Sequence, residues 1–556
     1  MANYITLVEI ALDAATEYCS FRGVSADRWY ADYVEEISPI TRECPRLPGE
    51  ATVSDCSIVL NDFDSHWSTL KNSAAFYGRT VSIKFGEASA GIAAFTTLYT
   101  GIITDVSFEA GHCLLEVRDV SYDLLDNKLT GLLTDITSPV LPPGVAATLL
   151  PIIYGTHSSV GGTNAGAVPC YRLGWHNKVG DFTGRYYYAV ARHLCAIDRI
   201  YVYGKMYSWS AAAGDTITPF WPSPYNNMAI IGFYVDPLDP DRDADFEVTA
   251  DVRGVDYATT LMVNPVSQLA HYLENYAGVS SGDIDMATAI AAAVHRTSAL
   301  WIGGQTITHR EVLNKFLQSF GMNFFHTRAG KYAAFMPDYD AIDLDTLTAL
   351  SDQVDVVRES FGVEFPEDLA SKSEYLFAFD PTTDEYTRRE SVEVASETAN
   401  LGQAITVAHE FPCVRDQNQA AALAHVALYR MRENQQYFTF ALPVEHYTLD
   451  LNQNIKMSHY QGPSASGLGY DSTVGRILQL EIAAAPREAQ INALCENVFN
   501  VGADDVYPRY FKLGALATLG GLTWLGGSNQ DYGALCALAT NKFANNQDGK
   551  RLFTRG

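Results

Sequence analysis

The clearest alternation of hydrophobic and polar residues lies between Thr52 and Leu129. Its two-residue period predicts a strand with one buried face that includes Ile102. The turn-forming Glu109-Ala110-Gly111 and a second alternating run predict a hairpin, followed by a short helix from about Ser121 to Leu125. The buried face is expected to carry Leu98, Thr100, Ile102, Thr104, Val106 and Phe108 on one strand, and Cys113, Leu115 and Val117 on the other.

Patterning elsewhere in the first half of the chain predicts short strands separated by loops. Tyr4 to Leu12 alternates as a strand, and the Pro-rich, charged stretch from Ser38 to Gly49 is expected to be a loop. Leu141-Pro142-Pro143-Gly144 breaks regular structure, because neither proline can donate a backbone hydrogen bond, and it predicts a domain edge. Pro151–Gly155 opens the next segment. A Gly-rich loop, the run Tyr186–Tyr188 and a strand expected at Ile200–Tyr203 follow it.

A helical period replaces the strand period from Pro265 to Thr297. Thr308 and Glu311 then form a predicted capping box, in which each side chain satisfies a free amide of the first helical turn. The apolar positions Leu313, Phe316, Leu317 and Phe320 predict one buried face, and Gly321 ends the helix. A hairpin of 324–326 with 331–335 completes a small helix-plus-hairpin unit.

The second half contains another strand-rich module. Strands are predicted at 375–379 and 387–392, a helix at 418–432, and strands at 437–442, 454–459 and 474–482. The last strand is expected to place Val474, Leu478, Leu480 and Ile482 on one face, opposite Ile477, Gln479 and Glu481. Paired glycines around Trp524 in the terminal segment favour an extended arm that docks on a neighbour, with an unbound terminus as the alternative.

Composition narrows the class of protein. The 556 residues exceed one core and suggest roughly three to four domains. A net charge of −27 argues against a nucleic-acid reader, although it suits either a conduit that DNA slides past or a soluble assembly component. Nine cysteines without C-x-x-C spacing predict buried free thiols made in a reducing cytoplasm. The sequence predicts neither a signal peptide nor a membrane-spanning segment.

No residues are assigned to catalysis, to a cofactor or to a metal. The acidic run from Asp236 to Glu247 fails both frames of a calcium loop, so a solvated loop is favoured over an irregular metal site. Gly462–Ser466 lacks the closing glycine of a nucleophile elbow. The pairs His409-Glu410 and Glu445-His446 are strand neighbours, which point to opposite faces. Two carboxylates far apart in the sequence can meet in space, but the motifs predict no enzyme.

Several segments in a fixed order resemble the tail hub (baseplate hub) proteins of long-tailed bacteriophages. The first module resembles the first hub barrel through SDCSIVLND, GRTVSIKFG and LYTGIITDVSFEAGHCLLEVRDVSYDLLDNKL, with G-x-I strands, a strand ending in Arg118-Asp119 and a small helix. Pro151–Gly155 is similar to the P-x-x-Y-G segment that opens an inserted domain. The helix-plus-hairpin unit also looks like one found between hub barrels, although any α+β packing unit would share its pattern.

The second half of the chain resembles the second hub barrel, in which a helix is followed by a strand, a turn and a further barrel strand. The residues in those places are Ala420, Leu423, Ala424, Arg430, Arg432, Phe438, Thr439, Phe440, Leu442 and Pro443. The sequence departs from the family where 449–453, Leu-Asp-Leu-Asn-Gln, replaces the usual Pro-Gly-Asp turn. The resemblance covers Tyr4 to Asn492 in ordered pieces.

The expected fold is therefore mainly β with α+β insertions, multidomain, with two antiparallel β-barrel hub domains around an intervening α+β region. The predicted units are a first hub barrel (1–143), an inserted β-rich or α+β domain (144–300), the helix-plus-hairpin unit (301–345), a second hub barrel with helix 418–432 (346–500) and a C-terminal docking arm (501–556).

The resemblance implies a structural virion protein at the distal end of a phage tail, synthesised in the host cytoplasm. It implies a homotrimer that closes the tail tube and adapts its sixfold symmetry to a threefold tip during host attachment and genome ejection. Implied partners are the distal tail or tube ring, tail fibre or tip proteins and a tape measure protein, with DNA passing without specific binding. The alternative is a receptor- or glycan-binding tip protein that stacks sugars on Gly180–Tyr188, especially Tyr187. A tail-associated hydrolase ranks last.

Overall fold

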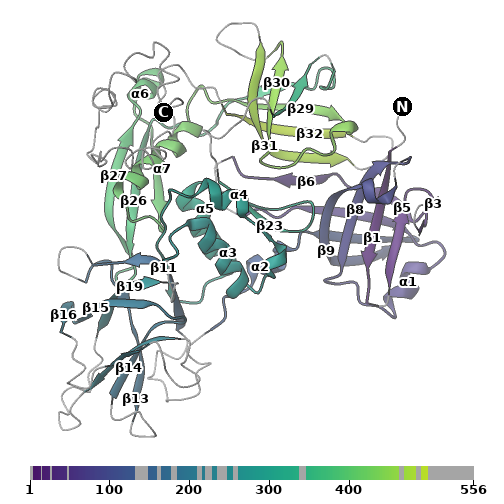
Figure 1. The fold of residues 1–556 in the computed structure, drawn as a ribbon. Coiled ribbons are helices and arrows are strands. Elements are labelled where there is room, and N and C mark those ends of the chain that lie inside the picture. The colour runs from purple at the N-terminus through teal and green to yellow at the C-terminus, as the bar shows by residue number, and fades with distance from the viewer. Residues whose placement is uncertain are drawn as a thin grey trace.

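The computed structural model confirms a mainly β, multidomain chain with several sheets (Figure 1). It describes residues 4–13, 15–25, 28–46, 49, 51–89, 91–131, 148–159, 164–176, 185–208, 216–218, 228–234, 247–254, 261–336, 346–352, 354–461, 469–483 and 490–498. The breaks at Leu141–Gly144 and Gly462–Ser466, most of the acidic run and the arm 501–556 lie outside the described residues.

An N-terminal module contains the expected hairpin. Its strands are β1 (Tyr4–Ala11), β2 (Thr16–Ser20), β3 (Val24–Ser25), β4 (Trp29–Tyr30), β5 (Val34–Ile37), β6 (Ile40–Glu43), β7 (Asp55–Asn61), β8 (Thr80–Glu87), β9 (Thr96–Glu109) and β10 (His112–Arg118), with helices α1 (His66–Lys71) and α2 (Ser121–Asp126). The hairpin of β9 and β10 and the helix after it confirm the sequence prediction.

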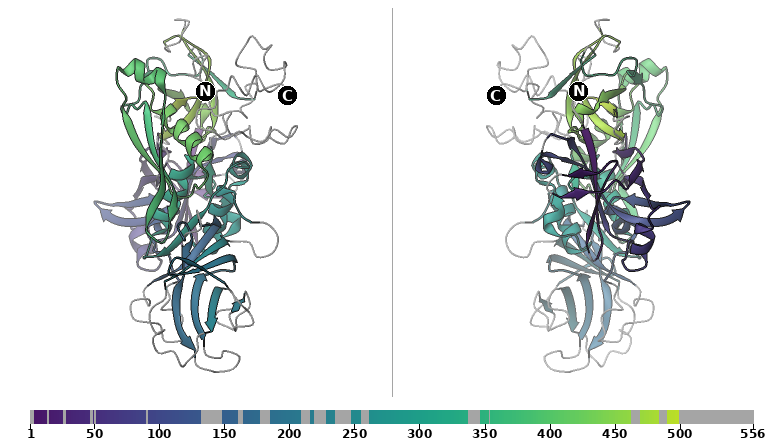
Figure 2. Two further views of the ribbon diagram at one scale, coloured as in Figure 1. Left: turned by 90° about the vertical axis from the view of Figure 1, so that its left-hand side faces the viewer. Right: turned by 90° about the vertical axis from the view of Figure 1, so that its right-hand side faces the viewer.

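Two further sheets form the inserted region. One has the order β16-β15-β19-β11-β21, with β12 beside β19, and the other the order β13-β14-β18-β17. In the side views of Figure 2 these strands make the lower end of the molecule. The strands are β11 (Leu149–His157), β12 (Val168–Pro169), β13 (Tyr171–His176), β14 (Arg185–Ala191), β15 (Ala196–Val202), β16 (Lys205–Tyr207), β17 (Thr216–Thr218), β18 (Ala229–Tyr234), β19 (Val248–Gly254) and β21 (Leu300–Gly304).

Helices and a hairpin occupy the centre of Figure 1. Thr308 and Glu311 form the expected capping box of α5, and Gly321 closes that helix with a left-handed φ of 61°. The face predicted to be apolar is buried in a core shared with α3 and β22. The elements are α3 (Pro265–Asn275), β20 (Ile284–Asp285), α4 (Ala287–Ala292), α5 (His309–Phe320), β22 (Asn323–His326) and β23 (Tyr332–Phe335).

The remaining chain forms a C-terminal module and a three-stranded sheet beside it. The module comprises β24 (Thr348–Ser351), β25 (Gly362–Glu364), β29 (Tyr437–Pro443), β30 (Asn454–His459), β31 (Tyr470–Ala483) and β32 (Gln490–Asn497). The small sheet comprises β26 (Lys372–Asp380), β27 (Glu385–Glu393) and β28 (Thr406–Phe411), with helices α6 (Ala395–Leu401) and α7 (Gln417–Arg430). The expected helix and strands are present, and β32 is a strand that the sequence patterning did not predict.

The two modules contain the same arrangement of strands. In the first the pairing order is β7-β10-β9-β8, and in the second it is β29-β32-β31-β30, each in the same order along the chain. The backbone of Ile103 pairs with Gly78 and Arg79 as that of Ile477 pairs with Asn452 and Gln453. The sheet of the first module is therefore repeated in the second with matched register.

Bulges recur at matching positions and shift the buried faces. Thr104 is the extra residue between Ile103 and Asp105 on β9, and Leu478 is the extra residue between Ile477 and Gln479 on β31. An extra residue turns the side chains beyond it to the other face of the sheet. Strict alternation is therefore wrong at Ile102 and Val474, because Ile103 and Ile477 lie in the common core instead. Leu98, Leu480 and Ile482 lie in that core as predicted.

A glycine precedes each of these core isoleucines by two positions. A Cβ at Gly101 would meet the carbonyl oxygen of Arg118 at 2.5 Å, and one at Gly475 would meet the Phe438 ring at 2.2 Å. Both glycines thus sit where a neighbouring strand or its side chain comes too close for any larger residue. The G-x-I pattern noted in the first module is the sequence trace of this repeated geometry.

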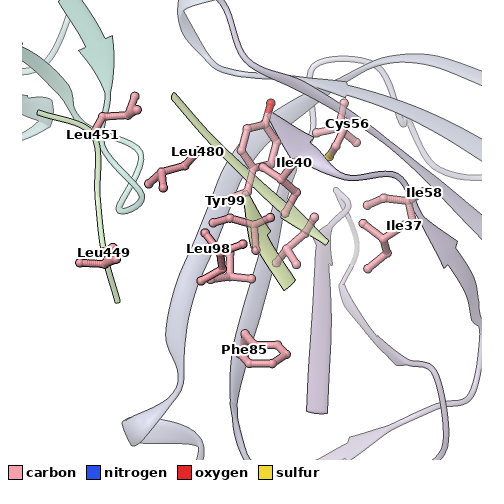
Figure 3. Packing of buried hydrophobic residues seen from close by; sticks show 14 of the residues in the cluster. Ile37, Ile40, Cys56, Ile58, Phe85, Leu98, Tyr99, Leu449, Leu451 and Leu480 are labelled. Carbon is pink, nitrogen blue, oxygen red and sulfur yellow. The ribbon is translucent and has the colours of Figure 1, made fainter. Parts of the chain in front are cut away.

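One short strand joins the modules into a single sheet. Residues 40–43, expected to be part of a loop, form β6, which pairs with β7 at Thr41 and with β31 along its whole length. The resulting sheet has 14 strands, and one hydrophobic core contains side chains from both modules. Figure 3 shows Leu480 of β31 among Ile40 and Tyr99 of the N-terminal module. We call the β6–β31 pairing the seam. Both modules are parts of this one sheet, and among the described strands neither module closes into a barrel of its own.

Candidate functional site

A buried arginine on β6 fixes the seam. Arg42 is 2% exposed, its guanidinium forms an ion pair with Asp450, and its Nη2 donates a hydrogen bond to the carbonyl oxygen of His326 at 2.5 Å. Burying a charge costs free energy unless it is paired and hydrogen-bonded, and here both conditions are met. Arg42 therefore links β6 to the C-terminal module and to the β22–β23 hairpin at one point.

The other half of this ion pair, Asp450, lies in the turn 449–453. Leu449 and Leu451 point into the common core, and Asp450 between them carries the carboxylate (Figure 3). Asn452 has a left-handed φ of 59° and matches Gly78, whose φ is 71°. Asn452 thus keeps the left-handed conformation of its counterpart, and Asp450 adds a charge at the seam.

A second arginine reaches the same turn from the β22–β23 hairpin. Arg328, which is 8% exposed, donates to the carbonyl oxygens of Tyr447 and Leu449, and its Nε lies 3.7 Å from Asp450 Oδ2. Burial lowers the pKa of the Arg328 guanidinium to about 10, while the charge of Asp450 acts in the opposite direction. Arg328 is still cationic at neutral pH, so a single carboxylate serves two buried guanidiniums. We call Arg42, Arg328 and Asp450 the seam cluster.

The hairpin also contacts the first module. The Thr100 hydroxyl on β9 donates to the carbonyl oxygen of Arg328 at 3.2 Å, and Gly330 lies against the same side chain. Ile102, two residues along, is 8% exposed and lies outside the common core. The hairpin therefore contacts both modules.

Two further buried arginine clusters hold neighbouring units together. Glu496 on β32 accepts from Arg430 of α7 at 3.1 Å and lies 3.7 Å from Arg476 of β31. The Arg476 guanidinium stacks 4.6 Å from the Phe335 ring centre. These contacts fix α7 and the β22–β23 hairpin to the C-terminal module.

Arg415 performs the same role at the inserted region. Its guanidinium donates to Nδ1 of His157 at 2.7 Å and to the carbonyl oxygens of Gly166 and Phe379 at 3.1 and 3.0 Å. Burial lowers the pKa of Arg415 to about 10. Burial and the nearby Arg415 charge together hold the pKa of His157 well below its usual value. His157 is thus a neutral acceptor, and the joint is a fixed one.

In the two acid–histidine pairs considered as catalytic groups, the acid and the histidine do not act on a common partner. His409 Nδ1 lies 2.7 Å from the Ser373 hydroxyl, whereas Glu410 accepts from the Tyr386 hydroxyl at 3.1 Å. His446 Nε2 lies 3.2 Å from Asp355 Oδ1, and Glu445 is exposed. Within the described ranges, no three His, Cys, Asp or Glu side chains gather as a metal site.

The aromatic residue proposed for sugar stacking is buried. Tyr187 is 3% exposed and packs in a hydrophobic cluster with Leu173 and Ile230. The expectation that Tyr187 stacks on a glycan is therefore wrong, because its ring is already covered by the protein. Residues 180–184 of that loop lie outside the described residues.

The prediction of buried free thiols is confirmed for most of the described cysteines. The eight described cysteines are free, and all but Cys195 are buried. Burial raises the pKa of Cys44 and of Cys413 to about 12, so these thiols are protonated and unreactive. In the part of the chain that the structure describes, no helix is long and apolar enough to cross a membrane.

Sequence comparisons find neither a matching protein-family model nor a matching curated protein. Solved structures do resemble the chain in outline. One is a chain of the virion of a native gene transfer agent particle (12% identity, TM-score 0.42, covering 64% of this chain and 87% of that one). Solved phage tail proteins are among the structural neighbours of this chain.

Two of these are prophage tail proteins. The 43 kDa tail protein of prophage MuSo2 from Shewanella oneidensis has 9% identity and a TM-score of 0.41, covering 89% of this chain and 98% of that one. Tail protein gp18 of a Listeria monocytogenes prophage has 6% identity and a TM-score of 0.38, covering 91% and 98%.

Sequence reasoning did not single out the three residues of the seam cluster. In the sequence, Asp450 belongs to an unusual turn and Arg328 to a hairpin loop, and neither position marks a buried charge. Arg42 lies in a four-residue alternation, Ile40 to Glu43, that is too short to distinguish a strand from a charged loop.

Proposed function

We propose that this chain is a structural phage tail (baseplate) hub protein that assembles as a homotrimer and closes the end of the tail tube. The observation that carries the proposal is the repeated four-strand unit, with the same strand order, the same register and bulges at the same places. Two matched modules per chain give six comparable surfaces in a trimer, which suits a threefold tip on a sixfold tube.

The buried arginine clusters support the role of a rigid adaptor in the tail. The seam cluster, the Glu496 pair and the Arg415 joint each tie together elements from different parts of the chain. Charges buried with several hydrogen bonds specify one geometry, because any other arrangement leaves a charge without its partners. The modules are therefore held in a fixed relative position, as an adaptor between two rings requires.

The five-unit division at 143, 300, 345 and 500 belongs to this proposal, with the seam as the contact between the two hub units. The proposed partners are the distal tail or tube ring, tail fibre or tip proteins and a tape measure protein, at the distal end of the virion. The acidic balance suits a channel that DNA passes without binding. In this role the chain has no enzymatic activity.

Native mass measurement of the purified chain tests the oligomer. A mass three times that of one chain is expected, while a stable monomer or hexamer, both in isolation and in the particle, contradicts the proposal. Imaging of particles in which the chain carries a label at residue 556 should place three labels at the distal end of the tail.

A further inference from the structure

The seam shows how one module attaches to another. β6 occupies the edge of β31, with Ile40 opposite Ile482 and Arg42 opposite Leu480. The amide of Cys44 donates to the carbonyl oxygen of Leu478, the bulge residue, at 2.7 Å. The N-terminal module thus provides a strand that covers the C-terminal module just beyond its bulge.

The matching edge of the N-terminal module is open. Beyond the bulge residue Thr104, the segment Asp105–Phe108 of β9 pairs only with β10 among the described strands. A groove of about 540 Å³ lies beside it, lined in part by Tyr77, Thr104 and Asp105. Tyr77 and Phe108 are 54% and 39% exposed, whereas Leu451, which matches Tyr77, is buried in the common core.

The C-terminal module has its own counterpart of β6. β25 lies beside β29 as β6 lies beside β7: Glu364 is opposite Tyr437, and Thr41 is opposite Asp55. Because β7 and β29 are matching strands in matched register, Glu364 matches Thr41, and the next residue, Phe365, matches Arg42. Phe365 is 50% exposed, while Arg42 is 2% exposed. The C-terminal module thus contains a counterpart of β6 that pairs with β29 but, among the described strands, with no counterpart of β31.

We infer that Val363–Pro366 of one copy pairs antiparallel with Asp105–Phe108 of a second copy, repeating the seam between chains. The inference rests on the proposed trimer and names its interface. The register copied from the seam places Val363 opposite Phe108 and Phe365 opposite Val106, two apolar cross-strand pairs of a kind that stabilises sheets. Such a head-to-tail contact closes into a ring when its rotation divides the circle.

Pro366 is compatible with this register. In the seam, the amide of Cys44 donates to β31. Because successive amides of a strand point to opposite sides, the amide of Arg42 also points towards β31, and the amide of Glu43 points away from it. Pro366 matches Glu43, whose amide points away from β31, so a proline there removes no hydrogen bond across the interface. On the receiving edge, the Val106 amide donates to Asp105 Oδ1 at 2.8 Å, and a carbonyl oxygen of the incoming strand would replace that acceptor.

Charge makes the interface sensitive to salt. Asp105, Glu116 and Arg118 line the groove. Glu364, which forms an ion pair with Arg46, lies on the incoming strand, and Glu367 and Asp368 follow it, so acidic groups outnumber basic ones on both sides. Like charges repel over about 10 Å at 0.1 M salt and over shorter distances as salt is added. The contact should therefore strengthen as ionic strength rises, and an isolated chain at low salt is protected from premature pairing.

Paired cysteines test the register. Glu364→Cys and Ser107→Cys in one chain would face each other at a non-hydrogen-bonded pair, where Cα atoms lie about 4.5 Å apart and a disulfide fits. The control pair is Ser107→Cys with Asp368→Cys, also exposed but four positions out of register. Mild oxidation at high salt should give dimers and closed trimers on non-reducing gels, at least about tenfold more for the first pair than for the control.

The outcomes separate the interface from the trimer. If native mass shows a trimer and the first pair cross-links no better than the control, this interface is wrong and the hub proposal stands. If the unsubstituted chain is monomeric at every salt concentration and in the particle, both fail.

A substitution that leaves the fold intact gives a second readout. Phe365→Asp should abolish the trimer in native mass measurement, because it places a charge opposite Val106. Met206→Asp, at a side chain that is 63% exposed in the inserted region, should leave the trimer unchanged. A trimer that survives Phe365→Asp overturns the inference.

Discussion

Asp450→Asn should loosen the seam although it changes only one charge. The amide keeps the oxygen that accepts the Leu451 amide at 2.8 Å, so the turn is retained. Arg42 and Arg328, 2% and 8% exposed, are then left as buried cations without a carboxylate. The pair of guanidiniums also loses the charge that offsets their mutual repulsion.

The size of the effect follows from burial. Removing one partner of a buried ion pair costs about 3–5 kcal/mol. The Asp450 side chain is 34% exposed, so water already screens part of the interaction and the lower end, about 3 kcal/mol, is expected. Since about 1.4 kcal/mol corresponds to a factor of ten, the opening equilibrium of the seam should rise about 100-fold.

Native-state hydrogen exchange with mass detection measures this opening at the peptides that contain β6 and residues 479–482. Asp198→Asn provides the control, because Asp198 pairs with Arg253 in an exposed ion pair of the kind that contributes about 0–1 kcal/mol. Adding Arg42→Met to Asp450→Asn should recover part of the loss, since the unpaired cation is gone. Exchange at β6 that rises less than about threefold in Asp450→Asn would refute the view that charge, rather than sheet pairing alone, holds the modules together.

Three further outcomes are expected. Ile103→Ala and Ile477→Ala should cost similar free energies of unfolding in urea titrations, about 2–5 kcal/mol each, because both occupy matching positions in one core; a large inequality would contradict the equivalence of the modules. Gly155→Ala should prevent soluble expression or cost well over 1 kcal/mol, because φ is +68° and its Cβ would meet the Ser298 oxygen at 2.0 Å, while Gly91→Ala, with nothing within 4 Å, should be neutral. Burial lowers the pKa of His326 to about 4, below its value of about 6.5 in an unfolded chain, so its contribution is complete above pH 6.5 and falls as the pH drops from 6.5 towards 4. His326→Gln should flatten that loss, about 2 kcal/mol between pH 7 and pH 5, in urea titrations at the two pH values; an unchanged pH slope would show that His326 does not titrate this way.

Local patterns in the sequence determined the elements whose stability is local. The β9–β10 hairpin follows from alternation and its Glu109–Gly111 turn, and α5 follows from its capping box, apolar face and terminal glycine. These features depend on residues within one or two turns of each other, so a single stretch of sequence contains all the information that they need. The mainly β class and the order of elements followed in the same way.

Only the tertiary structure decided which faces are buried beyond a bulge. A bulge is defined by the partner strand, so the shift at Thr104 and Leu478 cannot be read from one strand alone, and alternation placed Ile102 instead of Ile103 in the core. The same holds for β6, whose four residues are a strand because an edge of β31, more than 400 positions later, is there to receive them.

The residues of the seam cluster are far apart in the sequence and come together only in the folded chain. Arg42, Arg328 and Asp450 come from three separate regions, and each by itself looks like an ordinary surface charge. Folding removes them from water together, and their interaction strengthens because the surroundings become less polar. The sequence determined the two modules; the position of one relative to the other was decided by a short strand and three charges that meet only in the folded chain.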